Sequence, residues 1–195
     1  DVDNTQKVDE IREDFLTRSF GSAKEAMRSF YDLIDGKVKP LLSAHLLGGM
    51  YRALEEAYSQ TTDPAVTDRI DDLVAYVRYV ELFRVYLKAQ GQERQEAYEN
   101  MLRFCKSVRS RGMIHDHGIT RTQTGYDKTV TLTDEQLDAM RDPAPSHEEF
   151  REIVKMGIAQ NPLLTFSPQA FSSDLVPLPG SAIPADADGE AVFQI

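Results

Sequence analysis

Apolar side chains recur at the spacing of one helix face from Val8 to Val108. Val8, Ile11, Phe15 and Leu16 follow this spacing and predict a helix that ends at Gly21. Comparable stripes predict four more long helices, over residues 22–35, 43–58, 64–90 and 92–111. The pattern therefore favours a helical protein.

Capping residues mark where these helices begin. Ser43 is a predicted N-cap, and Asp63 followed by Pro64 combines an N-cap with proline at the first helical position. Three capping boxes, in which Ser or Thr precedes Glu or Gln by three residues, stand at Ser22–Glu25, Thr133–Gln136 and Ser146–Glu149. The last two predict short helices near 134–141 and 147–160.

The fourth long helix carries two apolar faces. One face consists of aliphatic residues, among them Val66, Ile70, Leu73, Val77, Val80 and Leu87. The second is aromatic, with Tyr76, Tyr79, Phe83 and Tyr86. Aromatic rings can stack on sugars, but helical spacing favours packing in the core. Two apolar faces predict a helix covered on two sides, and hence a central one.

Residues 113–132 lack a clear helical period and are predicted to form a loop, with a short β-like run at 129–132. No repeat of 34 or 40 residues is visible, so a helical solenoid is not predicted. The predicted fold class is all-α, a bundle or array of about five long and two short helices with a loop-rich C-terminal segment.

The division predicted along the chain is a helical domain over 1–160 and a proline-rich exit segment over 161–195, which holds five of the nine prolines. The β-like run Ala191–Ile195 points toward a following β-domain. The chain starts at Asp1, and the first residues lack the basic and apolar parts of a signal peptide. We therefore expect a piece of a longer protein, from which an upstream signal peptide could already have been removed.

The charge balance narrows the classes of partner. The 195 residues carry 22 Lys and Arg against 32 Asp and Glu, a formal net charge of −10. The acidity is concentrated after residue 122, where 12 acidic residues face 4 basic ones. This balance argues against a nucleic-acid partner, which needs clustered basic residues. No apolar run approaches the roughly 18 residues of a membrane-spanning helix.

The predicted loop contains the candidate binding residues His115, Asp116 and His117, with Arg121 beyond. Two histidines two positions apart resemble metal ligands, because an extended backbone places both rings on one side. A metal site would need a third ligand, with His45, His147 or a distant carboxylate as candidates. The alternative is an ordinary loop in which His115 packs or hydrogen-bonds and His117 is exposed.

Basic residues gather in one stretch, which makes Arg103, Arg109 and Arg111 candidate anion ligands, with Lys106 between them. The simpler interpretation is that they complement the negative end of a helix and pair with nearby acids. Neighbouring carboxylates at Glu55–Glu56, Asp71–Asp72 and Glu148–Glu149 point about 100° apart on a helix, so we interpret them as solvated faces. Cys105, the single cysteine, falls on a core-facing position and is predicted to be an inert buried thiol.

Several segments together resemble the helical region of a known family: Asp14–Gly21, Ala26–Leu33, Met50–Ala57 and Asp63–Val66. The chain resembles the domain-of-unknown-function 4838 family, which is similar to α-glucuronidase-type glycoside hydrolases, over roughly residues 8–160. The resemblance implies a parent protein with a catalytic barrel upstream of the helical region and β-sandwich modules after it. Met113-Ile114-His115 falls where that family shows an apolar-apolar-His run.

The leading hypothesis is a non-catalytic helical accessory domain of a carbohydrate-active, glycoside-hydrolase-like protein, supporting or rimming a neighbouring barrel. The resemblance implies an extracellular or periplasmic location, neighbouring domains of the same polypeptide as partners, a carbohydrate ligand, and a homodimer. Two alternatives stay open: a stand-alone helical module that binds other proteins, and a metal-dependent enzyme using His115 and His117. No catalytic residue and no cofactor is assigned within this chain, and whether the parent is an enzyme is left open.

Overall fold

The computed structural model describes residues 2–35 and 41–164, and for residues 2–6 and 121–125 it describes the backbone alone. The fold is all-α, as the sequence predicts, and the described part contains no β-strand. The α-helices are α1 (Val2–Phe20), α2 (Lys24–Asp32), α3 (Ala44–Ser59), α4 (Pro64–Lys88), α5 (Gly91–Ser107), α6 (Asp116–Tyr126), α7 (Asp134–Ala139) and α8 (His147–Gln160). Short 3₁₀ turns stand at Gly21–Ala23 and Arg109–Arg111. Nearly all of the predicted exit segment, together with the β-like run at its end, lies outside the described residues.

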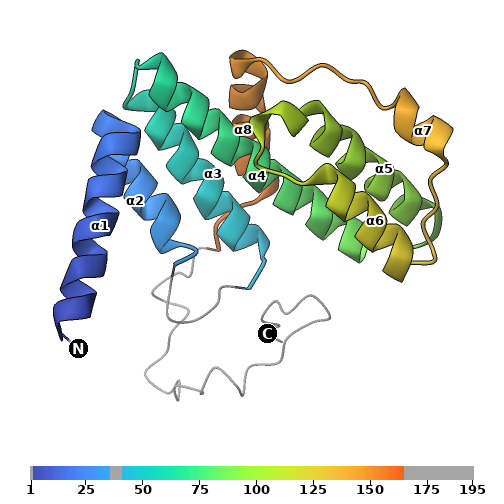
Figure 1. The fold of residues 1–195 in the computed structure, drawn as a ribbon, viewed down its shortest axis with the longest axis horizontal. Coiled ribbons are helices and arrows are strands. Elements are labelled where there is room, and N and C mark those ends of the chain that lie inside the picture. The colour runs from blue at the N-terminus through green and yellow to red at the C-terminus, as the bar shows by residue number, and fades with distance from the viewer. Residues whose placement is uncertain (1, 36–40, 165–195) are drawn as a thin grey trace.

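Helix α4 is the central element, which confirms the prediction from its two apolar faces. It contacts α1, α3, α5 and α8 (Figure 1). Ile70, Val74 and Val77 are fully buried on its aliphatic side. On the aromatic side, the rings of Tyr79, Phe83 and Tyr86 follow one another at centroid distances of 6.0 Å. The aromatic stripe becomes more exposed at Tyr76, which is 40% accessible.

Four predicted helix starts are confirmed by their hydrogen bonds. Ser43 accepts from the amide of Leu46, and Asp63 accepts from the amide of Ala65 ahead of α4. Thr133 and Ser146 each form a complete capping box, at the starts of α7 and α8. These starts could be predicted because each cap is made within three residues of the chain.

The capping box predicted at Ser22–Glu25 is wrong. Gly21 has φ +51°, and residues Gly21–Ala23 form a 3₁₀ turn instead of the extended entry that an N-cap needs. Helix α2 begins at Lys24, after Ala23, with no side-chain cap. The Ser22 hydroxyl donates instead to the carbonyl of Gln60 at 2.6 Å, across to the end of α3.

The loop predicted over 113–132 is also wrong, because it contains α6. Threonine and glycine make this segment a weak helix former, which hid the helix from a pattern search. Asp116 supplies the acidic first turn that suits a helix N-terminus. The β-like run at 129–132 is no strand; the amide side chain of Gln95 bonds both backbone groups of Thr131, at 2.7 and 2.9 Å, as a neighbouring strand would.

Helices α3, α4 and α8 meet around a buried carboxylate, that of Glu81, which is 6% exposed. The Tyr51 hydroxyl donates to Glu81 at 2.9 Å, and the side-chain amide of Asn161, just after α8, donates at 2.6 Å. Gly157 lets α8 lie directly on the Tyr51 ring, because a Cβ there would overlap that ring. Burial and the adjacent Glu81 raise the pKa of Tyr51 well above its usual range.

Candidate functional site

A cleft of about 520 Å³ opens where the end of α3, the first turns of α4 and the start of α8 come together. Its polar lining includes Thr61, Thr62, Thr67, Asp68, His147 and Arg151. The Ser146 capping box fixes the first turn of α8 and so places His147 as the first residue of that helix. Arg151 follows one turn later, on the same face.

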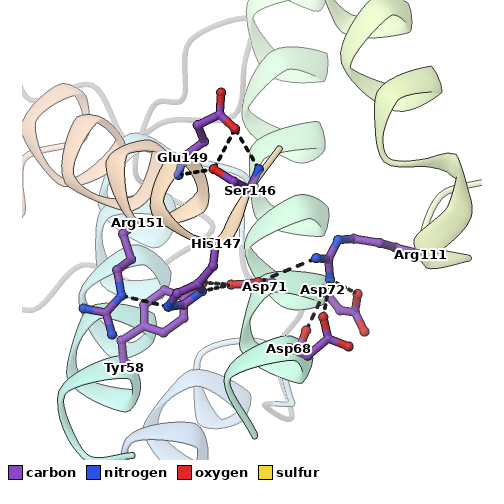
Figure 2. Close-up of polar contacts among 9 residues, drawn as sticks. All are labelled: Tyr58, Asp68, Asp71, Asp72, Arg111, Ser146, His147, Glu149 and Arg151. Atoms are coloured by element: carbon purple, nitrogen blue, oxygen red, sulfur yellow. Dashed lines mark hydrogen bonds and ion pairs between the residues drawn. The ribbon is translucent and has the colours of Figure 1, made fainter. Parts of the chain in front are cut away.

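Asp71 is the buried carboxylate behind this cleft, and Figure 2 shows the groups that converge on it. The Tyr58 hydroxyl of α3 donates to Oδ1, and Nδ1 of His147 lies 3.0 Å from the same oxygen. A terminal nitrogen of Arg111 lies 3.6 Å from Oδ2. Asp71 therefore joins α3, α4, α8 and the turn after α5. The prediction that the Asp71–Asp72 pair forms a solvated face is wrong for Asp71, which is only 3% exposed.

The contacts of His147 define its tautomer. Nε of Arg151 donates to Nε2 of His147 at 3.1 Å, so Nε2 must carry a lone pair. The proton of the neutral imidazole is then on Nδ1, which donates to Asp71. Burial, followed by the hydrogen bond to Asp71, raises the pKa of Tyr58 far above that of a free phenol. Tyr58 therefore stays a neutral donor.

Arg151 is held in place on two sides. Its guanidinium carbon lies 4.8 Å from the centroid of the Tyr58 ring, and its Nε is bonded to His147 (Figure 2). Its two terminal amino groups make no hydrogen bond within the described part of the chain. The cleft is thus lined by an oriented guanidinium whose terminal N–H groups can donate hydrogen bonds to a ligand.

Arg111, a predicted anion ligand, binds aspartates of its own chain. Its guanidinium lies 2.8 Å from Asp72 and 3.2 Å from Asp68, besides the contact with Asp71. It also covers the ring of Phe150 at 4.7 Å. Arg111 therefore offsets the negative charge of three aspartates in the second and third turns of α4, Asp68, Asp71 and Asp72.

Of the other two predicted anion ligands, Arg109 lines a separate hollow of about 400 Å³, together with Lys106, Asp138 and Arg141 among others. Arg109 pairs with the buried Asp116 at 3.1 Å, and Arg103 reaches Asp142 at 3.4 Å. The structure therefore places Arg103 and Arg109 near one hollow and Arg111 at another site.

The predicted binding loop is the first turn of α6. The rings of His115 and His117 are both exposed, with centroids 6.4 Å apart, whereas Asp116 between them is buried. His117 borders a cavity of about 550 Å³ between α6 and α7. Among the described residues, no three His, Cys, Asp or Glu side chains converge as metal ligands. The side chain of Arg121 lies outside the described part of the chain.

Cys105 is fully buried, which confirms its predicted core-facing position, and burial raises the pKa of its thiol to about 12. Sequence reasoning missed Tyr58, Asp71 and Arg151 as site residues, and considered His147 only as a distant metal ligand. The one local signal was the spacing of His147 and Arg151, four residues apart after a capping box. Asp71 and His147 are 76 residues apart in the chain, and only the folded structure joins them.

Helix α1 lies at one edge of the molecule (Figure 1) and carries exposed apolar side chains. Of the four residues predicted to share a helix face, Leu16 is buried, whereas Val8, Ile11 and Phe15 are 61%, 67% and 45% exposed. Phe15 leans on Phe20 and Tyr31 with ring centroids 5.9 and 5.8 Å apart, which joins the stripe to the body of the protein. We call Val8, Ile11 and Phe15 the α1 stripe.

Comparison with family models, with curated proteins and with solved structures gave no match. None of the described helices combines the length and the apolar character needed to cross a membrane.

Proposed function

We propose that this chain is a non-catalytic helical accessory module that assembles with a second copy of itself through the α1 stripe. The observation that carries the proposal is the exposure of Val8, Ile11 and Phe15 on an edge helix. Three large apolar side chains in one row on a helix are a common means of helix–helix association. Leu16 and Phe20 anchor the same helix in the core, so the stripe is presented on a supported element.

The charged residues beside the α1 stripe support a second copy of the chain as the partner that covers it. Lys7 and Asp14 lie along the same outer edge of the α1 stripe, because seven residues separate them on the helix. An antiparallel pairing of two α1 helices, centred on Ile11, places Lys7 of each copy beside Asp14 of the other. In the single chain Asp14 pairs with Arg18 at 2.7 Å, but both side chains are more than half exposed, so exchanging this partner costs little.

The role as an accessory module rests on the family resemblance. In proteins of that kind the helical region accompanies a catalytic barrel, so we propose a carbohydrate-active parent outside the cytoplasm and neighbouring domains of the same polypeptide as further partners. The packed all-α body and its internally paired charges are consistent with a supporting domain.

Sedimentation equilibrium of the purified chain tests the assembly. We expect a concentration-dependent rise from the chain mass of 22.0 kDa toward twice that value. The stripe is short, and association costs several kcal/mol of lost freedom, so a dissociation constant of roughly 1–100 μM is expected. Ile11→Asp should stay monomeric over the same range, because it places a charge at the centre of the interface.

Leu87→Asp is the matched control, because Leu87 is 50% exposed on α4, away from the α1 stripe. It should associate like the wild type, and circular dichroism should show that both variants keep their helix content. A wild type that stays monomeric at every concentration, or equal dissociation by both substitutions, would overturn the proposal.

A further inference from the structure

We infer that the cleft between α3, α4 and α8 binds a small carboxylate that also carries hydroxyl groups, with Arg151 as its principal donor. This inference is independent of assembly through α1, because it rests on residues of α3, α4 and α8.

The Arg151 side chain is oriented before a ligand binds. A free arginine side chain loses much rotamer freedom when it binds a ligand. Here the Tyr58 ring supports the guanidinium plane, and the bond from Nε to His147 fixes the rotation of that plane. The two terminal amino groups remain as a fork with the geometry of a carboxylate. The ligand therefore meets a donor pair that is already in place.

The charges around the cleft favour a ligand with a single negative charge. Asp71 lies behind Arg151, but donors from Tyr58, His147 and Arg111 take up its negative charge. Asp68 keeps an exposed carboxylate, 71% accessible, on the lining of the cleft, and Arg111 holds one of its oxygens at 3.2 Å. A carboxylate with a single negative charge can approach Arg151 under these conditions, whereas a phosphate dianion is repelled more strongly by Asp68.

The rest of the cleft lining is rich in hydroxyl groups and acceptor oxygens. Thr61, Thr62 and Thr67 bring hydroxyl groups, and Asp68 brings acceptor oxygens. These groups are suited to hydroxyls on the ligand. A ligand hydroxyl can donate a hydrogen bond to the Asp68 carboxylate, and it can donate to or accept from a threonine hydroxyl. A volume of about 520 Å³ is within the range of small-molecule sites. A hydroxylated monocarboxylate therefore matches both the Arg151 guanidinium and the hydroxyl and carboxylate groups of the lining.

The test is an NMR titration of the whole chain that follows the Arg151 Nε–H and the His147 ring signals. The probes are glycerate, glycerol and glycerol phosphate, which share a hydroxylated three-carbon chain. Glycerate carries a carboxylate, glycerol phosphate carries a phosphate, and glycerol carries no acidic group. We expect saturable shifts with glycerate, at least about tenfold weaker binding of glycerol phosphate, and none with glycerol. Arg151→Lys keeps the positive charge but loses the fork, and should weaken glycerate binding at least about tenfold.

Arg141→Lys is the matched control, because Arg141 lines the separate hollow near α7 and should leave glycerate binding unchanged. Arg151 is a partly exposed residue, so its lysine variant is expected to fold, and circular dichroism checks this. Any of three outcomes would overturn the inference: no saturable shift with glycerate, binding of glycerol or glycerol phosphate as tight as that of glycerate, or full binding by folded Arg151→Lys.

Discussion

Two tyrosines of α3 donate hydrogen bonds to two buried carboxylates of α4. Tyr51 bonds Glu81 and Tyr58 bonds Asp71, so the same type of contact recurs along the helix pair. A buried carboxylate is costly without such donors, and a bond to a charged acceptor is stronger than one between neutral groups. Each of these tyrosines is therefore fixed in two ways: its ring is packed in the core, and its hydroxyl is bonded to a carboxylate of α4.

Gly157→Ala tests how tightly the Tyr51 ring is held. The new Cβ would overlap the ring, which cannot swing away without losing its bond to Glu81. We expect a loss of roughly 1–3 kcal/mol in the free energy of unfolding, measured by urea denaturation. Gly118→Ala is the control: its Cβ would meet the exposed His115 ring, which can rotate away, so stability should stay equal or rise by up to about 1 kcal/mol.

Elements far apart in the chain are joined by single carboxylates. Asp127, just after α6, accepts from Tyr86 of α4 and from Nε of Arg94 of α5, the latter at 2.7 Å. It also accepts from the hydroxyl and the amide of Thr129, at 2.6 and 2.9 Å. The bonds from Thr129, followed by that from Tyr86, hold the pKa of Asp127 well below its usual range. The arrangement holds the chain after α6 against the α4–α5 pair.

This pKa direction has a defined consequence for acid stability. A depressed folded-state pKa means that ionised Asp127 stabilises the fold above its unfolded pKa of about 3.9, and that the contribution disappears as pH falls toward the folded value. Asp127→Asn should therefore cost about 2 kcal/mol at pH 7 and progressively less below pH 4. Urea denaturation at several pH values measures it.

Asp9→Asn, at an exposed position of α1, serves as the control and should change little at any pH. An Asp127→Asn deficit that stays constant down to pH 2 would contradict the assignment of the charged form as the stabilising one.

For the whole molecule, the features that the sequence predicts correctly are mostly local, although the local capping box at Ser22–Glu25 does not form. Ser43, Asp63 and Ser146 mark helix starts because their partners lie within three residues, and the two apolar faces of α4 reveal its central position. Helix α6 is not predicted, because its threonines and glycines give no clear helical spacing of apolar residues. The cleft could not be predicted, since Tyr58, Asp71 and His147 meet only through the packing of three helices. Likewise, the helical spacing of the α1 stripe does not tell whether another part of the chain covers it.

The central claim for the whole molecule is antiparallel pairing of two copies through α1. Cross-linking at Ile11 tests it most directly, because a two-fold axis at this position brings both Ile11 side chains together. The native Cys105 does not interfere, since it is fully buried and its thiol pKa is raised to about 12. We predict that Ile11→Cys forms a disulfide-linked dimer under mild oxidation, whereas Thr17→Cys, exposed on another face of α1, does not. Equal cross-linking of the two variants, or none at position 11, would contradict the account.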